Sequence, residues 1–215
     1  MSSQIQVSDL ICQSCNKRII TNRYLASVVN LDTISYDCEQ FMSGELNRVE
    51  CPHCKEVFTC EIPMIIFSEK LKYACMVSPT LEECGVISLK PPPAFLVSDF
   101  KLRAVRYQIE ALEKFRINSA GLDDAVVEYI KYIKFIDEDA LPFHERNIVF
   151  DKLTDGVYHF SKVDFNNRIL NTYQFEFPEY LIPASICDFS ETLNSNQWHK
   201  IDRITIREEI NNAKV

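Results

Sequence analysis

The N-terminal part of the chain is rich in the β-branched and apolar residues that favour β-strands. β-Branched residues are frequent over residues 18–29, and two apolar runs at residues 57–67 and 71–77 flank a short polar turn. These patterns predict an extended strand followed by a β-hairpin, whose first run contains a proline typical of an edge or a bulge. Residues 35–42 predict a short helix, with Gly44 where a C-terminal cap is expected.

Three consecutive prolines at residues 91–93 predict a stiff, extended connector, because proline continues neither a helix nor a sheet. After it, apolar residues recur every three or four positions over residues 99–116, which predicts a helix capped by Asp99. A second such pattern over residues 123–137, capped by Asp123, predicts another helix with a wide and therefore largely buried apolar band. Together they predict a helical hairpin.

From residue 147 onward the pattern returns to strands. Three runs, NIVF, GVYHFSKVDF and RILNTYQFEF, are separated by the turn-forming pairs Asp155-Gly156 and Asn166-Asn167. Residues 198–210 are expected to close the chain with a strand or a short helix. The whole pattern predicts an α+β protein.

Three segments follow from this reading of the chain. We expect a β region over residues 1–90, the proline connector with the helical hairpin over residues 91–140, and a C-terminal antiparallel β region, packed on the rest, over residues 141–215.

Two cysteine pairs lie in the first segment, Cys12-Gln-Ser-Cys15 and Cys51-Pro-His-Cys54. Two residues between cysteines allow a tight turn to direct both sulfurs to one point, and two such turns complete a tetrahedral shell of four thiolates around Zn²⁺. Residues 16–50 separate the pairs, a longer gap than a minimal zinc ribbon needs. The segment is therefore predicted to be a zinc-ribbon-like β region with an insertion, holding one Zn²⁺.

The alternative interpretation is four unrelated buried thiols, or a redox pair. A redox C-x-x-C pair is expected to open a helix after a strand, whereas residues 55–58 predict a strand. Four thiolate ligands leave no open coordination position, so the predicted zinc is structural and not hydrolytic.

The other five cysteines show no metal-ligand spacing. Cys60 and Cys75 lie in predicted strands and are expected to be small core residues. Cys38, Cys84 and Cys187 have no paired partner in the sequence, so a second metal site is not predicted.

Composition restricts the function further. The formal net charge is −8, which disfavours nucleic acid as a partner because such binding needs a basic surface. Only 4 glycines occur, which disfavours glycine-rich phosphate loops. The N-terminus shows no signal-peptide pattern, and no apolar run approaches the ~18 residues of a membrane span. We therefore expect a cytoplasmic protein without a membrane partner, whose 9 cysteines are reduced thiols or metal ligands.

Several motifs resemble those of the CpXC family of bacterial and archaeal proteins. The first block is Cys51-Pro-His-Cys54, preceded by Ser43-Gly-Glu-Leu-Asn47 and followed by the predicted hairpin at residues 63–79. The second block consists of Leu102-Arg-Ala-Val-Arg106, Leu112-Glu-Lys114 and Gly121-Leu-Asp-Asp-Ala125, with Glu128 and Lys131.

The resemblance implies zinc at the four cysteines and implies no established activity. Two positions depart from the family pattern. The first pair lacks the proline of the second, which only pre-sets the turn, so both of its cysteines are kept as ligands. Lys55 stands where family members often have a glycine, so the turn there is expected to be strained.

A protein-binding module without enzymatic activity is the function we favour, in a bacterial cytoplasmic system. Three observations favour this function: the absence of catalytic motifs, the apolar helical hairpin and the acidic surface. The pattern sets no oligomeric state. An accessory role in a defence or toxin–antitoxin operon is an alternative of the same kind.

A nucleic-acid-binding zinc protein is the second hypothesis. It rests on the zinc site together with a group of basic residues on the predicted first helix, which are alternatively solvated charges partnered by Glu110 and Glu113. This group is Lys101, Arg103, Arg106, Lys114 and Arg116.

An enzyme is the third hypothesis. Asp123 and Asp124 with Glu128 offer paired carboxylates, but acidic residues at a helix start are more simply explained by the helix dipole. No G-x-S-x-G, Walker, H-E-x-x-H or G-x-G-x-x-G motif occurs.

Overall fold

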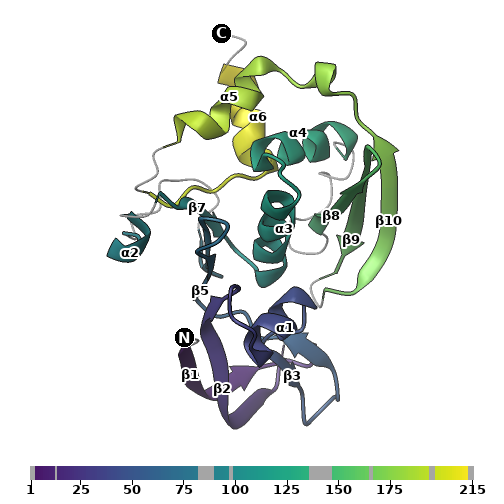
Figure 1. The fold of residues 1–215 in the computed structure, drawn as a ribbon. Coiled ribbons are helices and arrows are strands. Elements are labelled where there is room, and N and C mark those ends of the chain that lie inside the picture. Colours follow the sequence, from purple (N-terminus) through teal and green to yellow (C-terminus); the bar gives the residue numbers. More distant parts are fainter. Residues whose placement is uncertain are drawn as a thin grey trace.

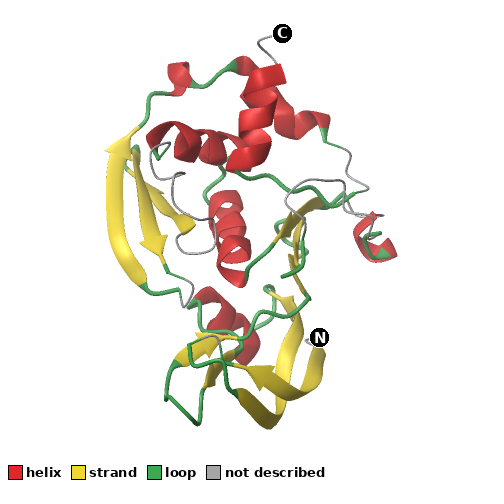
Figure 2. Cartoon of the chain, turned by 180° about the vertical axis from the view of Figure 1, so that it is seen from behind, coloured by secondary structure: helices red, strands yellow, loops and turns green. Residues whose placement is uncertain are grey.

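The computed structural model describes residues 3–12, 14–81, 90–96, 99–135, 147–164, 167–193 and 197–212. Within these residues the strands form a five-stranded, a three-stranded and a two-stranded sheet, which with the helices confirms the predicted α+β class (Figure 1). Helix α3 (Gln108–Ser119) lies in the middle of the molecule, between the five-stranded and the three-stranded sheets (Figure 2).

The five-stranded sheet has the strand order β1-β2-β5-β6-β7. β1 pairs with β2 and β5 with β6 in antiparallel fashion, whereas β2 with β5 and β6 with β7 are parallel. β2 is 13 residues long, and only its last three residues pair with β5. The β1–β2 hairpin therefore extends beyond the rest of the sheet. The bounds are β1 Ser3–Ile11, β2 Arg18–Asn30, β5 Met64–Ser68, β6 Tyr73–Val77 and β7 Lys101–Val105.

The apolar run at residues 57–67 forms two strands, so the prediction of a single strand was wrong. β4 (Val57–Thr59) pairs with β3 (Arg48–Glu50) in the two-stranded sheet, and β5 belongs to the five-stranded sheet. Pro63 immediately precedes β5, a position where its missing N–H breaks no sheet hydrogen bond. The proline marks the point where the chain changes sheets.

Helix α1 (Tyr36–Met42) confirms the predicted short helix. The Ser35 hydroxyl accepts the N–H of Cys38 at 3.2 Å and caps the first turn. Gly44 has φ +74°, the left-handed conformation expected just beyond a helix end. Phe41 on this helix packs edge-on against Phe115 of α3, with ring centroids 6.1 Å apart.

The predicted helix over residues 99–116 was wrong in its first half. Residues 101–105 form β7, which pairs in parallel with β6, and the helix begins only at Gln108. Leu102 and Val105 lie three positions apart and fit a helix as well as a strand buried on both faces. Parallel pairing with β6 decided for the strand, because it supplies the backbone hydrogen bonds that a helix would have made internally.

Helix α4 (Asp124–Lys134) begins where the sequence predicts. The Asp123 carboxylate accepts the N–H of Ala125 at 2.8 Å, which confirms its role as the cap. The helix ends at Lys134 and not near residue 137, and residues 136–146 lie outside the described ranges. α3 and α4 are adjacent and joined by a short turn through Gly121, whose φ is +70°.

The C-terminal strands form the predicted antiparallel sheet, in the order β10-β9-β8. Asp155 and Gly156 both have positive φ, 52° and 78°, as a two-residue hairpin turn requires. Of the second predicted turn, Asn167 has φ 60° and Asn166 lies outside the described residues. The strands are β8 Asn147–Thr154, β9 Val157–Val163 and β10 Ile169–Glu176.

Four further short elements lie at the end of the proline connector and after the C-terminal sheet. The proline connector ends in a single helical turn, α2 (Pro93–Leu96), since proline is tolerated at the first helical position. After β10, a 3₁₀ turn (Glu179–Leu181) leads to helix α5 (Ala184–Thr192), which the sequence pattern did not predict. The predicted closing element is helix α6 (Arg203–Asn212). Tyr129 of α4 packs edge-on against Phe177, which directly follows β10.

The division into three segments stays a prediction. Strand pairing crosses its first boundary, because β7 lies after residue 90 and pairs with β6 before it.

A buried ion pair joins β7 to α4. Arg103 and Asp124 are 2% and 3% exposed, and the guanidinium donates from Nε and Nη2 to the two carboxylate oxygens at 2.5 and 3.0 Å. Burial disfavours the charged carboxylate, but Arg103, and after it Lys114, outweigh this and hold the pKa of Asp124 well below its usual range. Arg103 is thus a core residue and not part of a basic surface.

Two further lysines are buried between α3 and α4. Lys114 donates to Glu128 at 2.9 Å, and Lys131 donates to Glu113 at 3.0 and 3.1 Å and to Glu128 at 3.1 Å. The network reaches two other parts of the chain through backbone atoms. Lys114 also donates to the carbonyl of Ile201, and Glu113 accepts the N–H of Phe150 in β8.

Replacing Arg103 by methionine is expected to lower the free energy of unfolding by about 3–5 kcal/mol, because Asp124 would be left buried without its counter-charge. Chemical denaturation followed by circular dichroism measures this change. Arg23→Met, at an exposed position of β2, is the control and should change stability little. The double variant Arg103→Met with Asp124→Leu should recover much of the loss, and equal losses in the single and double variants would contradict the assignment.

Candidate metal centre

The four predicted cysteines converge at one point, although residues 16–50 separate the two pairs. The sulfur atoms of Cys12, Cys15, Cys51 and Cys54 all lie within 4.8 Å of one another. The Sγ atoms of Cys12 and Cys54 are 3.7 Å apart, and those of Cys15 and Cys51 are 3.8 Å apart. A tetrahedron with metal–sulfur bonds of ~2.3 Å has edges of about 3.8 Å, so these two distances fit a four-thiolate metal site.

Both cysteine pairs use the same backbone turn. In the first, the N–H of Asn16 donates to the carbonyl of Cys12 at 2.9 Å, and in the second, the N–H of Lys55 donates to the carbonyl of Cys51 at the same distance. Asn16 and Lys55 have φ of 58° and 64°. Each pair therefore needs a left-handed residue directly after its second cysteine, a conformation that asparagine tolerates better than lysine.

Each turn is held by its own pair of strands. The first connects β1 to β2, and the second connects β3 to β4. Asn47 joins the two units: its side chain accepts the N–H of Ala26 and donates to the carbonyl of Ala26, both at 2.9 Å. Its own carbonyl accepts the N–H of Cys60 at 2.9 Å. Asn47 is a positioning residue that the cysteine spacing did not indicate, although it lies in a block that resembles the family.

Burial differs among the four thiols. Cys12 and Cys51 are fully buried, Cys15 is half-buried and Cys54 is exposed. The first two lie in a small apolar cluster with Ile19, Leu25 and Phe58, among others. The site therefore sits at the edge of a local core, with one ligand at the surface.

Local hydrogen bonds favour ionisation of some of these thiols and not others. Backbone donation from Cys15 lowers the pKa of Cys12 to about 6. Burial opposes ionisation of Cys51, but donation from the backbone of Cys54 and His53 outweighs it and lowers the pKa. For Cys54, desolvation of the sulfur and contact with the neighbouring thiols raise the pKa to about 12. Holding all four as thiolates thus calls for a cation in their midst.

The remaining cysteines are spread over the molecule. Cys60 and Cys75 are buried, as predicted for core residues, while Cys38 is half-buried and Cys187 exposed; Cys84 lies outside the described residues. Among the residues that the structure describes, the four cysteines form the one group with metal-ligand geometry.

The basic group assigned to the first helix does not form one surface. Lys101 and Arg103 lie on β7 and not on a helix, and Lys114 is buried. Their partners also differ from the expected Glu110 and Glu113. Lys101 pairs with Asp123 at 3.3 Å, Arg103 with Asp124, Lys114 with Glu128, and Arg116 with Asp151 at 3.3 Å.

Two of the three acidic residues considered on α4 have a role that helix-dipole reasoning missed. Asp123 caps the helix, but Asp124 and Glu128 are buried and neutralise Arg103 and Lys114. Asp124 and Glu128 are four positions apart, which places them on the same face of a helix. That this face is buried could be learned only from the structure.

Replacing Lys55 by glycine is expected to raise the free energy of unfolding by on the order of 0.5–1 kcal/mol, because glycine removes the left-handed strain at a modest entropic cost. Lys55→Ala is the matched control, since it removes the same exposed side chain and keeps the strain. Thermal unfolding of the metal-loaded protein compares the three chains. Equal stabilities of the glycine and alanine variants would show that the turn is not strained.

Comparison with known proteins adds one finding to this geometry. A family model described as "CpXC protein" matches residues 10–131, which is more than half of the chain and includes all four cysteines. Neither the search of curated proteins nor that of solved structures finds a match. No helix in the described ranges combines the length and apolarity needed to cross a bilayer. By the extent of the family match, this chain belongs to the CpXC family.

Proposed function

We propose that this protein is a non-enzymatic, zinc-stabilised module that binds another protein in a bacterial cytoplasmic system. The observation that carries the zinc part is the set of four sulfur atoms within 4.8 Å of one another. Thiolates select soft or borderline cations, and a tetrahedral shell of four sulfurs is typical of structural Zn²⁺. Such a shell leaves no position for water or substrate, which favours a structural over a catalytic metal.

Reduced thiols support a cytoplasmic setting. The 8 described cysteines are all free, including the buried Cys60 and Cys75. Free cysteines in this number are typical of reducing compartments.

The surface that we propose for the partner differs from the one the sequence suggested. The apolar residues of the helical hairpin are largely buried in the core, for example Leu112, Ile117 and Ile130. Large apolar side chains are instead exposed on the β1–β2 hairpin that extends from the sheet. Ile11, Ile20 and Tyr24 are 63%, 85% and 62% exposed.

The register of this hairpin places its exposed groups together. Ile11 lies opposite Arg18, and Ile20 lies opposite Asp9. Because side chains two positions apart point to the same face of a strand, these four residues share the outer face, where Arg18 and Asp9 form an ion pair. Exposed apolar side chains beside paired charges are a composition that protein-binding surfaces also have.

The nucleic-acid alternative keeps only part of its support. Besides the zinc site it rested on five basic residues along one helix, of which Arg103 and Lys114 are buried in ion pairs. A role as an accessory component of a defence or toxin–antitoxin operon remains a variant of the protein-binding proposal, since such components act through partner proteins.

The zinc part predicts one zinc ion per chain, measured by elemental mass spectrometry on protein purified without chelator. Cys12→Ser and Cys51→Ser should lose the metal and melt well below the wild type, because structural zinc contributes folding free energy on the order of 10 kcal/mol. Cys187→Ser, at an exposed thiol outside the cluster, should keep both. Unchanged melting after complete metal removal would contradict a structural role.

The partner part predicts that the tagged protein captures a stoichiometric host protein from a nuclease-treated lysate. Ile20→Lys should weaken binding of the purified partner by about tenfold or more, as loss of a central apolar contact does. Ile34→Lys, which alters a 99% exposed residue beyond the other end of β2, is the control and should bind normally. Capture that disappears with nuclease would favour a nucleic acid instead.

A further inference from the structure

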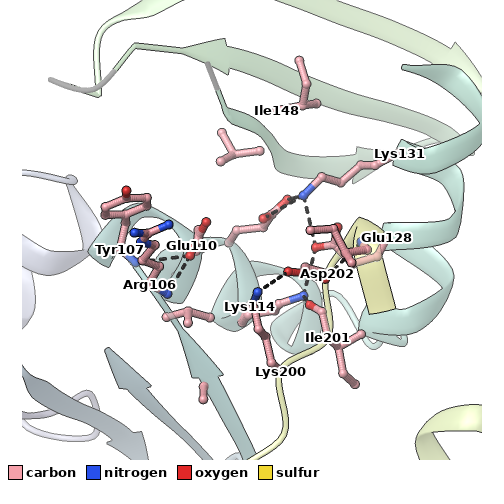
Figure 3. Close-up of a pocket in the computed structure, with 15 residues that line it drawn as sticks. Arg106, Tyr107, Glu110, Lys114, Glu128, Lys131, Ile148, Lys200, Ile201 and Asp202 are labelled. Atoms are coloured by element: carbon pink, nitrogen blue, oxygen red, sulfur yellow. Dashed lines mark hydrogen bonds and ion pairs between the residues drawn. The ribbon is translucent and has the colours of Figure 1, made fainter. Parts of the chain in front are cut away.

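A cavity of about 90 Å³ lies where α3, α4, β7, β8 and the segment before α6 meet (Figure 3). Its lining includes the apolar Val105, Ile148 and Ile204 as well as charged side chains from α3 and α4. The volume is enough for several water molecules or a small organic group, since one water needs about 10–15 Å³.

Three of the four acids that line this cavity are neutralised by a neighbouring lysine. These pairs are Glu113 with Lys131, Glu128 with Lys114, and Asp202 with Lys200. Glu110 is the fourth acid, and it makes no ion pair with a described residue. Its Oε2 accepts the backbone N–H groups of Arg106 and Tyr107 at 2.8 and 3.2 Å. The cavity thus contains one carboxylate that forms no direct ion pair with a described residue.

Two carboxylate oxygens in the lining accept no hydrogen bond from any described residue. Glu110 bonds only through Oε2, and Glu128 only through Oε1, which accepts from both lysines. Among the described residues, the Tyr73 hydroxyl is the one enclosed side-chain polar atom without a partner. Glu110 Oε1 and Glu128 Oε2 therefore reach accessible space, and for Glu128, which is 2% exposed, that space is the cavity.

We propose that this cavity binds an organic cation, a guanidinium or ammonium group on a short aliphatic stem. The unused atoms are acceptors, which suits a ligand that donates hydrogen bonds. The apolar part of the lining suits the stem. The proposal is independent of the zinc site and of the protein-binding surface.

Two other ligand classes fit less well. The described carboxylates include no group with metal-ligand geometry, so a bare metal ion is disfavoured. An anion would need a free cation, but Lys114 and Lys131 are engaged by carboxylates. The guanidinium of Arg106 donates to the carbonyl of Pro79 and lies against the Tyr107 ring, with 5.7 Å to its centroid.

Electrostatics of Glu110 agree with this assignment. Burial raises the pKa of its carboxyl, and the N–H groups of Arg106 and Tyr107, together with the charge of Lys131, offset this only in part. A cation held at Oε1 would offset the remaining cost of burial and stabilise the ionised form.

The test uses the full-length, zinc-loaded protein and isothermal titration calorimetry with butylguanidinium and butylammonium chlorides. Butylurea, which has nearly the same shape and no charge, is the neutral control. We expect the cations to bind and to protect the backbone amides around residues 106–110 from hydrogen exchange, and butylurea to do neither. No binding of either cation at millimolar concentration, or equal binding of butylurea, would overturn the proposal.

Glu110→Gln keeps an oxygen to accept the two backbone N–H groups and removes the charge. It should weaken cation binding by at least about tenfold, the loss expected for one charge-assisted hydrogen bond. Glu61→Gln is the matched control: Glu61 also accepts a backbone N–H at the start of α3, from Gln108, and does not line the cavity. Equal affinities in both variants would overturn the assignment to Glu110, and a melting curve checks that each variant is folded.

Blocked glycine peptides with a central arginine or lysine distinguish the source of the cation. Tighter binding of these peptides than of butylguanidinium would indicate a side chain of a partner protein, and exclusive binding of the free cations would indicate a small molecule. Either result supports the site.

Discussion

The centre of this molecule depends on the mutual neutralisation of six buried charges. Arg103, Lys114 and Lys131 face Asp124, Glu113 and Glu128, and each of these side chains is at most 7% exposed. Burying a single unpaired charge at such depth costs a large free energy. Each of these groups can therefore be buried only next to a group of opposite charge. The network therefore fixes how β7, α3 and α4 lie relative to one another.

The same network explains how the C-terminal part joins the family-matched part. The match ends at Lys131, the last charged member of the network. Beyond it, contacts to the network come from backbone atoms: the carbonyl of Ile201 accepts from Lys114, and the N–H of Phe150 donates to Glu113. The carbonyl of His199 also accepts the N–H of Ala104 at the edge of β7. Backbone contacts place few demands on side-chain identity, so these contacts to the network need no charged side chain from the C-terminal part, while Asp151 pairs with Arg116 outside the network.

The cysteine cluster organises a different region, in which little apolar surface is available. Its local core is small, and two short turns, each with a left-handed residue, present the four sulfurs. Asn47 ties the second turn to β2 through two hydrogen bonds to Ala26. A metal at the sulfurs and the side-chain amide of Asn47 would thus hold the strands of the N-terminal region together, as the buried ion pairs hold the elements at the centre. The exposed hairpin belongs to the region around the cysteine cluster, and the central cavity belongs to the region around the buried charges.

The sequence by itself determined the features that depend on short-range chemistry. The C-x-x-C spacing located the four sulfurs, Ser35 and Asp123 stand at the helix starts, and Asp155-Gly156 gives the hairpin turn. Each of these needs only a few neighbouring residues, so its physical cause is visible in the chain. Tertiary structure alone decided that residues 101–105 form a strand, that the apolar run ending at residue 67 is shared between two sheets, and that Arg103 and Lys114 are buried. Those outcomes depend on partners distant in sequence, because a backbone donor or a charge can leave water only where the rest of the fold supplies its counterpart.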